Sequence, residues 1–468
     1  MWVLPTYGRP ERCQAALDSI AACGGSSRGI VVIDGDSSEG YWQLRLPENW
    51  HSELLPTNVG VCEALNTIFR AYPNEPWYGF ISDDSIVRTR GFEAPLVTAA
   101  GRTGFANSAD GWQAHKRMHG AVVFGGDLLR ALGWWAPPGL RHSFVDDAWE
   151  FLGHALGNWA RVPQVLIEHH HFGNNKAERD ATYDAAYASA KEDQATFYRL
   201  RRDELPAAVA RAIPVVVGDD PARCRIARAK SRSVMIATPI GRHPVWQYTL
   251  AFAETCVALD RLGIPYRTAM IIGGKLPMAR NEIVARFLAS DCTDLICIDD
   301  DMGWKGDDVL RLIGSDKPVI AAVGRKRVDK PNRDKDVWCV KFPDDAGTNL
   351  VQDALGNVLA KRVGAAFMKI ERSVFERMIK AHPDWKRTGK KEWGQAVQDR
   401  YYKFFSFDDG DVEMGEDFLF CDRWRALGGE VWIDPEIELS HVGEKDYRGA
   451  ICEIMQPEAP AAMLEAAE

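Results

Sequence analysis

Short continuous apolar runs alternate along the chain with segments that have the periodicity of helices. The runs at 29–34, 234–240 and 294–299 are rich in Val and Ile, as strands buried on both faces are. Segments 10–22 and 278–290 carry their apolar residues at helical spacing. Strands that alternate with helices predict an α/β fold, with a mostly parallel sheet covered by helices on both sides.

One segment interrupts this alternation. Residues 201–233 contain Pro206, Pro214 and Pro221, a basic cluster and a single short apolar run, which predicts an irregular linker. The predicted domains are therefore residues 1–200 and 234–455, followed by a tail at 456–468. A length of 468 residues agrees with two or three domains of ordinary size.

The two halves repeat the same motifs in the same order. Each half begins with a strand that runs into a Pro/Gly turn with a basic residue, and continues with a strand that ends in carboxylates. The paired segments are 3–10 with 236–244, 78–86 with 295–304, 120–129 with 364–375, 145–157 with 415–428, and 169–173 with 440–443. Asp147 precedes His171 by 24 residues, and Asp417 precedes His441 by the same 24. We interpret the halves as one fold used in tandem.

Composition narrows the class of protein. The net charge of −9 argues against a surface that is basic throughout, although it leaves room for a local basic groove. The ten cysteines are scattered without a C-x-x-C pair, which argues against a zinc knuckle or a disulfide framework and favours a reducing cytoplasm. We expect neither a membrane span nor a secretory signal. The 16 tryptophans suit core packing first and sugar-binding surfaces second.

Carboxylates gather where strands end. Asp299, Asp300 and Asp301 follow an apolar strand, and three adjacent acids there either form a solvated acidic turn or bind a divalent cation together with phosphate oxygens. The second interpretation is the stronger because the strand before them is fully apolar. Asp83 and Asp84 form a weaker copy in the first half.

Acidic pairs also open two amphipathic helices. Asp146 with Asp147, and Glu416 with Asp417, suit either the electrostatics of a helix start or a general base for an acceptor hydroxyl. The histidines that follow at equal spacing favour the chemical role. A lone histidine is usually structural, but an imidazole beside a carboxylate and phosphates suits Mn²⁺.

In their order and duplication these motifs resemble family 2 of the nucleotide-sugar-dependent glycosyltransferases with the GT-A fold. The resemblance rests on PTYGRPERCQAALDSI at 5–20 with VVIDGDS at 31–37, on NVGVCEALN at 58–66, and on residues 275–302. It covers nearly the whole chain, twice. It implies two tandem GT-A domains that transfer sugar with inversion, from a nucleotide-sugar donor such as a UDP-sugar, with Mn²⁺ or Mg²⁺.

The resemblance also implies roles for individual residues. The bases would be Asp147 and Asp417. The ligands of the metal or diphosphate would be Asp84, His171, Asp301 and His441. Substrate contacts would come from Pro5, Asp34, Asp36, Asn58, Asp83, Asp146, Pro239, Arg280, Asn281, Asp299, Asp300, Arg325, Lys326 and Glu416. The first half departs from the pattern, with Ser82 at the first acid of the D-x-D motif and Asp146 in place of Glu.

The acceptor is less well defined. The basic loop that begins at Arg325, with Lys330, Arg333 and Lys335 further on, is either a solvated surface or a clamp for an anionic partner. A glycan-type hydroxyl is the first expectation. Tandem enzymes of this kind in phages also modify hydroxymethylated DNA, which would place the protein in a host cytoplasm. The alternative is one active domain beside a catalytically silent carbohydrate- or partner-binding module.

Overall fold

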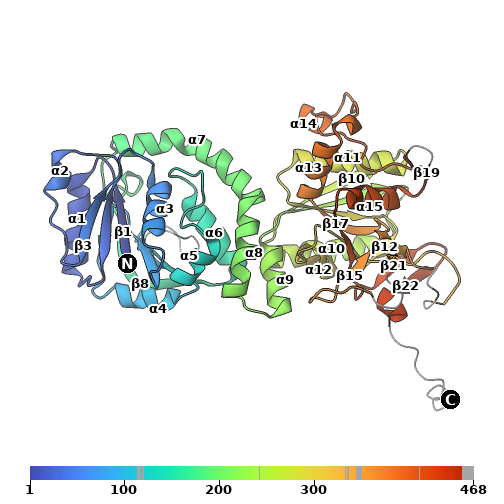
Figure 1. Ribbon diagram of the computed structural model, residues 1–468, viewed down its shortest axis with the longest axis horizontal. Helices are drawn as coiled ribbons and strands as arrows, with labels where there is room; N and C mark the ends of the chain where they lie inside the picture. The colour runs from blue at the N-terminus through green and yellow to red at the C-terminus, as the bar shows by residue number, and fades with distance from the viewer. Residues whose placement is uncertain are drawn as a thin grey trace, which may run out of the picture. The chain divides into compact units, whose positions relative to one another are not determined.

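The computed structural model describes residues 1–112, 118, 121–241, 243–331, 334, 337–343, 350–409 and 412–455. By compactness the chain divides into unit 1, Met1–Ala227, and unit 2, Arg228–Glu468. Each unit contains a large β-sheet with helices packed on it, as Figure 1 shows. The predicted α/β class is confirmed, although the sheets are mixed rather than mostly parallel.

Unit 1 is built on an eight-stranded sheet in the order β3-β2-β1-β4-β7-β6-β8-β5. Its strands are β1 (Trp2–Thr6), β2 (Gly29–Ile33), β3 (Trp50–Leu54), β4 (Trp77–Phe80), β5 (Ser85–Val87), β6 (Phe105–Ala109), β7 (Val122–Gly125) and β8 (Trp159–His169). Its helices are α1 (Pro10–Ala22), α2 (Glu39–Trp42), α3 (Val61–Ala71), α4 (Glu93–Ala100), α5 (Gly126–Leu132), α6 (Val145–Leu156), α7 (Ala181–Arg202) and α8 (Glu204–Val216), with α9 (Pro221–Lys230) crossing into unit 2.

Unit 2 is built on a seven-stranded sheet in the order β10-β9-β11-β17-β13-β20-β15. Its strands are β9 (Val234–Ile240), β10 (Tyr266–Ile272), β11 (Asp294–Ile298), β13 (Val319–Ala321), β15 (Val358–Ala360), β17 (Phe367–Glu371) and β20 (Val431–Ile433). Smaller sheets contain β12 (Met302–Gly303), β21 (Leu439–Val442) and β22 (Asp446–Gly449), β14 (Val340–Lys341) with β16 (Arg362–Val363), and β18 (Asp408–Asp409) with β19 (Val412–Glu413). The helices are α10 (Trp246–Leu262), α11 (Leu276–Ala289), α12 (Asp308–Ile313), α13 (Arg372–Ala381), α14 (Gln395–Gln398) and α15 (Glu416–Ala426).

The two sheets share a sequence of ladder directions. In unit 1, β1 pairs in parallel with β2 and β4, β7 is antiparallel to β4 and β6, and β6 is parallel to β8. In unit 2, β9 pairs in parallel with β10 and β11, β17 is antiparallel to β11 and β13, and β13 is parallel to β20. The acid clusters follow β4 and β11, which hold the same place in these two orders.

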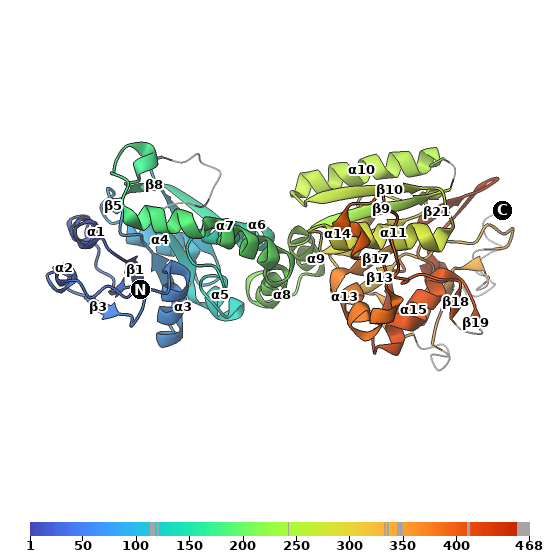
Figure 2. The same cartoon turned by 90° about the horizontal axis from the view of Figure 1, so that it is seen from above.

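Apolar side chains are buried on both faces of each sheet. In unit 2, α11, α13 and α15 cover one face through residues such as Ile283, Phe375 and Phe420, and α10 and α12 cover the other. Figure 2 shows α10 on the opposite side of this sheet from α13 and α15. Trp2 and Trp149 are fully buried in unit 1, so packing accounts for these members of the tryptophan excess. No helix among the described residues is both long and apolar enough to span a membrane.

The irregular linker predicted at 201–233 is instead mostly helical, in α8 and α9. Pro206 lies in the first turn of α8 and Pro221 begins α9, where the missing proline N–H has no helical partner to lose. Pro214 falls inside α8, near its end. Because α8 buries Leu205, Val209 and other apolar residues in the core of unit 1, tertiary packing outweighs the proline signal. The predicted tail at 456–468 lies outside the described residues.

Candidate functional site

The three acids that follow β11 have separate surroundings. Asp299 accepts two hydrogen bonds from Nη2 of Arg280, at 2.9 and 3.1 Å. Asp300 accepts one at 2.8 Å from the backbone N–H of Gly241, which follows β9. Asp301 precedes β12 and faces a histidine described below. The cluster therefore lies at the carboxyl end of the parallel strands, where α/β sheets bind ligands.

The guanidinium of Arg280 joins this cluster to the start of α15. Arg280 lies on α11, is 2% exposed, and donates through Nε to Oε1 of Glu416 at 3.1 Å. Its Nη1 donates to the carbonyl of Ala365 at 3.3 Å. Because each nitrogen of this buried cation already has a protein acceptor, the role of Arg280 is to hold the acidic side chains of the site in place. Its hydrogen bonds do not indicate the substrate contact that the sequence predicts.

Asn281 has a similar supporting position. Its side-chain amide donates to the carbonyl of Phe405 at 2.9 Å and accepts from the N–H of Phe405 at 2.8 Å. In unit 1, Asn66 on α3 closes a loop in the same way, through the backbone of Trp135 and Ala136. In both units a buried asparagine before the acid-bearing strand ties down a distant segment, so the polar groups of Asn281 are engaged by the protein.

Asp417 is the second residue of α15 and is half-buried. Burial raises its pKa and the neighbouring Glu416 carboxylate adds to the rise, while the N–H of Phe418, 2.7 Å from Oδ1, opposes it. Burial likewise raises the pKa of Asp299, against the lowering effect of Arg280. The N-cap residue of α15 is Gly415 without a side-chain cap, so capping does not account for Asp417. A raised pKa suits a proton acceptor.

His441 is brought to Asp301 by strand pairing. Met302 of β12 lies opposite His441 of β21 in an antiparallel ladder, and His441 Nε2 is 3.6 Å from Asp301 Oδ2. His441 Nδ1 lies 2.6 Å from the carbonyl of Arg325. Since a carbonyl only accepts, Nδ1 carries the proton and Nε2 of the neutral ring presents its lone pair toward Asp301. Burial lowers the pKa of His441, which favours this neutral form.

The residues at this position fit a divalent cation. A carboxylate and an oriented imidazole nitrogen are ligands that Mn²⁺ accepts. Arg327 contacts Asp301, but its side chain is 41% exposed and extends from a surface loop, so it can turn away. Among the residues that the structure describes, no three His, Cys, Asp or Glu side chains are grouped to hold a metal. Phosphate oxygens and water would therefore complete the coordination.

The acid pair of unit 1 is more enclosed. Asp83 accepts from the hydroxyl of Thr6 at 2.8 Å, and Asp84 accepts from the hydroxyls of Ser82 and Tyr183 at 2.7 and 3.0 Å. Both carboxylates are buried. Burial and the neighbouring Asp84 raise the pKa of Asp83. The hydrogen-bonding capacity of the two carboxylates is therefore met largely by groups of the protein.

The histidine beside Asp84 is His169 rather than His171. Ser85 of β5 pairs with His169 of β8, as Met302 pairs with His441, and His169 Nε2 is 3.3 Å from Asp84 Oδ2. His171 instead stacks on Trp112, and its Nδ1 accepts from the N–H of Gly173 at 2.9 Å. In the strand ladders His169, and not His171, thus holds the position that His441 holds in unit 2, so the equal 24-residue spacing does not pair the equivalent histidines. Unit 1 has one long strand, β8, where unit 2 has two short ones, β20 and β21.

Arg9 already supplies a cation to the acids of unit 1. Its Nη1 lies 3.4 Å from Asp83 and 3.7 Å from Asp84, and its Nε and Nη2 donate to Asp180 at 3.0 and 2.7 Å. The guanidinium also lies 4.0 Å from the ring centre of Tyr183. The side chain is only 8% exposed, so a metal ion would have to displace a pinned arginine. Among the described residues, the acid pair of unit 1 therefore does not fit a bound divalent cation.

The contact of Arg9 with the acids is not predicted from the sequence, although the Gly-Arg pair that contains it is repeated. Both halves follow their first strand with Gly-Arg, at Gly8-Arg9 and Gly241-Arg242, and the second arginine lies outside the described residues. The contact of Arg9 with Asp83 and Asp84 follows from the pairing of β1 with β4, which local sequence does not reveal.

A cavity of about 600 Å³ lies beside the acid pair of unit 1. Most of the site residues predicted in this half line it: Pro5, Asp34, Asn58, Asp83, Asp84, Asp146, Asp147 and His171. Asp34 accepts from the N–H groups of Val59 and Gly60, both at 2.8 Å, so it anchors the loop that contains Asn58. The structure thus gathers these residues at one hollow, reached by the ends of β1, β2 and β4 and the start of α6.

The remaining predicted residues have more varied positions. Asp36 is a turn residue that accepts from the N–H groups of Gly8 and Ser38. Pro239 lies within buried β9. Arg325 is buried with its guanidinium 5.5 Å from the ring centre of Tyr447, and Lys326 beside it is exposed. Of the basic loop, Arg333 and Lys335 lie outside the described residues.

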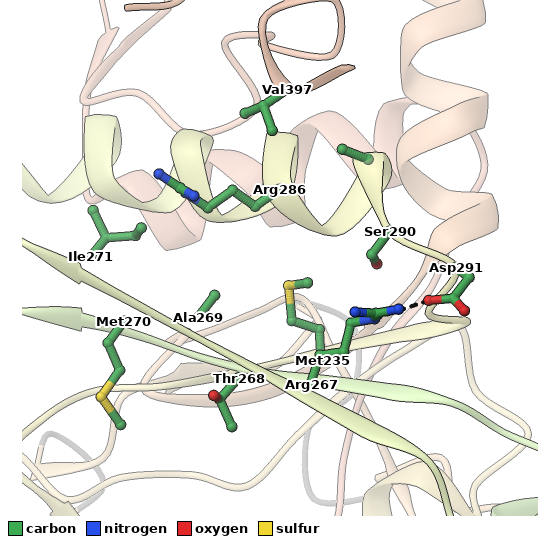
Figure 3. A pocket seen from close by; sticks show the side chains of 11 residues that line it. Met235, Arg267, Thr268, Ala269, Met270, Ile271, Arg286, Ser290, Asp291 and Val397 are labelled. Atoms are coloured by element: carbon green, nitrogen blue, oxygen red, sulfur yellow. Dashed lines mark hydrogen bonds and ion pairs between the residues drawn. The ribbon is translucent and has the colours of Figure 1, made fainter. Parts of the chain in front are cut away.

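A second hollow, about 930 Å³, lies between β10 and α11 of unit 2 (Figure 3). Its lining includes Arg267, which is paired with Asp291, and Arg286. None of the predicted site residues lines it. This hollow, although larger in volume than the cavity of unit 1, therefore does not contain the acid cluster of unit 2.

No family model matches the sequence, and no curated protein matches it. Among solved structures, the chain is similar to A197 from STIV, at 13% identity over 47% of this chain and 90% of that one, with a TM-score of 0.28. S. aureus TarS 1–349 matches at 15% identity over 49% and 87%, with a TM-score of 0.30. GalNAc-T7 with UDP, GalNAc and Mn²⁺ matches at 10% identity over 49% and 53%, with a TM-score of 0.33. At these values the likeness carries no inference about activity.

The difference between the two acid clusters predicts how the protein takes up metal. Titration of the full chain with Mn²⁺ in the presence of UDP, followed by electron paramagnetic resonance, should show one tight site. Asp301→Asn should abolish it and His441→Ala should weaken it by about tenfold or more. Asp84→Asn, the matched change in unit 1, should leave it intact. Two equal sites, or loss in Asp84→Asn, would contradict the assignment.

Proposed function

We propose that the protein is a glycosyltransferase and that transfer takes place in unit 2. The observation that carries this is the grouping of Asp417, Glu416 and Asp299 around Arg280, with the Asp301–His441 pair at the same strand end. Such a group offers a proton acceptor and a cation site together, which is what transfer from a nucleotide sugar to a hydroxyl requires.

The proposed reaction is a single displacement with inversion. The acceptor oxygen attacks the anomeric carbon of the donor, a UDP-sugar in the first instance, while Asp417 takes the hydroxyl proton. The bond from that carbon to the diphosphate oxygen breaks, and the nucleoside diphosphate leaves. Mn²⁺ or Mg²⁺, held by Asp301 and His441, would supply positive charge beside the leaving diphosphate. Arg280 keeps Asp299 and Glu416 in place, and the exposed Lys326 offers a further positive charge.

The raised pKa of Asp417 predicts the pH dependence. A base must be deprotonated to act, so activity should be lost as pH falls through its pKa. Since burial raises that pKa, kcat/KM should fall at a higher pH than the ordinary value for aspartate, about 3.9, would give. The residual activity of Asp417→Asn should lack this acid limb, and Asp422→Asn, further along α15, should keep it. An unshifted limb would contradict the role of Asp417.

The shared ladder order and the repeated motifs support a further part of the proposal, that the units are two copies of one fold. Unit 1 is the candidate for a binding module without catalysis, because Arg9 occupies the position beside Asp83 and Asp84 that a metal ion would need. Asp301→Ala should then abolish transfer and Asp84→Ala should leave it. Loss of activity in Asp84→Ala, with the fold intact by circular dichroism, would instead make unit 1 a second catalyst.

The direct test is incubation of the full chain with Mn²⁺ and a panel of nucleotide sugars, with release of nucleoside diphosphate as the measurement. Release that depends on Asp417 and Asp301 supports the proposal. No hydrolysis or transfer with any donor would refute it.

The proposed reaction is compatible with two classes of acceptor. A glycan-type hydroxyl needs no long-range charge, whereas hydroxymethylated DNA would use basic residues such as Arg327, which contacts Asp301, and the exposed Lys326. Binding to such DNA should then weaken steeply with salt. Binding that is absent or insensitive to salt would leave the glycan.

A further inference from the structure

The exposed face of α10 carries a stripe of apolar residues. Trp246, Leu250 and Val257 are 70%, 53% and 67% exposed, and Ala253 between them is exposed as well. Their spacing of four, three and four residues is that of the seam by which one helix packs along another. The buried side of α10 faces the sheet through residues that include Tyr248 and Leu259. Among the described residues of unit 2, the stripe therefore packs against no other element.

Unit 1 shows that the fold does not require such a face. Helix α1 connects β1 to β2 as α10 connects β9 to β10, and both first strands hold the same place in their sheets. On α1 the exposed positions are Glu11, Ala15, Asp18 and two further alanines. Of these two matched helices, only α10 has an outer face of large apolar side chains, and exposed apolar surface of this kind marks binding to another molecule.

The strand beside α10 is also less covered than the corresponding strand of unit 1. In unit 1, β2 is covered by a parallel ladder with β3, whereas β10 pairs with β9 alone among the described strands. Met270 and Ile272 of β10 are 45% and 81% exposed. They alternate with Ala269 and Ile271, which pack into the core on the α11 side, so they point to the face that carries α10. Figure 2 shows α10 above this edge strand.

We propose that this face of unit 2 binds a second copy of the chain, with α10 antiparallel to α10 of the partner subunit. The stripe is self-complementary in this direction, because its large residues come first and its small residues last. A two-fold axis midway between Leu250 and Ala253 sets Leu250 against Ala253 of the partner subunit, and Trp246 against Val257 of the partner subunit. A parallel arrangement would oppose tryptophan to tryptophan and leave a gap at the alanines. The proposal is independent of the function proposed above.

The test is the mass of the full chain in solution, by sedimentation equilibrium over a wide range of concentration. The expected result is a reversible dimer, with twice the mass of the 52.2 kDa chain. Leu250→Glu should weaken association by about 100-fold or more, since it places a charge in the apolar contact. Ala15→Glu, the matched change on the exposed face of α1, should leave the dimer unchanged. Both positions are exposed, so both variants should fold, and circular dichroism checks that they do.

A charge pair tests the direction of the helices. Leu250→Lys together with Ala253→Glu sets opposite charges against each other only in the antiparallel arrangement, so this double variant should dimerise at least tenfold more tightly than Leu250→Lys with Ala253→Lys. A monomer at every concentration, a dimer that is indifferent to Leu250→Glu, or equal association of the two double variants would overturn the proposal.

Discussion

Asp417→Asn should lower kcat for sugar transfer by roughly 10²–10⁴-fold, the range expected when a general base is removed. The change keeps the size of the side chain, but it removes the charge that Asp417 needs to accept a proton. The loss should appear in kcat with little effect on KM for the nucleotide sugar, because Asp417 acts on the acceptor. Rates of nucleoside diphosphate release at saturating donor measure both quantities.

Asp422→Asn is the matched control. Asp422 lies on the same helix and is paired with Arg362 at its surface, so its loss should leave kcat within about twofold. Equal losses in the two variants would mean that α15 is sensitive to any change in charge. Full activity in Asp417→Asn would remove this residue from the mechanism.

Arg280→Met should destabilise the chain by roughly 3–5 kcal/mol, the cost of breaking a buried ion pair by removing one partner. Arg280 is buried and binds Asp299 and Glu416 together, so its loss leaves two acids facing one another. Methionine fills most of the volume of the arginine stem, which limits the change to the charge. Urea denaturation, followed by tryptophan fluorescence and circular dichroism, gives the free energy of unfolding.

Arg286→Met provides the comparison on the same helix. Arg286 is 41% exposed and pairs with Glu282 one turn earlier, an interaction worth about 0.3–0.5 kcal/mol. A similar loss of stability in both variants would show that the buried network around Arg280 contributes no more to the free energy of unfolding than an exposed ion pair. If Arg280→Met kept full stability, the geometry of the acid cluster would have to be maintained by other contacts.

Local pattern was enough to predict the strands and the ends at which acids gather. The runs at 29–34, 234–240 and 294–299 coincide closely with β2, β9 and β11, because a strand buried on both faces needs uninterrupted apolar residues. The acids that follow β4 and β11 in the sequence necessarily lie at the carboxyl ends of those strands. These features depend only on neighbours in the sequence.

Features that depend on pairing between distant segments were missed or misplaced. The place of His169 beside Asp84 follows from the register of β5 against β8, which no count of residues along the chain contains. The family resemblance implied a substrate contact for Arg280, whereas its burial and its hydrogen bonds to Asp299 and Glu416 follow from the packing of α11 on the sheet. The helices at 204–216 and 221–230 form through contacts with the core of unit 1 that outweigh their prolines.

The bond between Arg9 and the first turn of α7 has a consequence for how the sequence can change. Asp180 caps α7 by accepting from the N–H groups of Thr182 and Tyr183, and it also accepts hydrogen bonds from Arg9, which follows β1. A lineage that lost Arg9 would leave three carboxylates, Asp83, Asp84 and Asp180, without their shared cation. Because Arg12 also lies 3.1 Å from Asp180, the two buried acids depend on Arg9 more than Asp180 does. A sequence change that removes Arg9 would therefore have to supply Asp83 and Asp84 with another cation or remove one of the two charges.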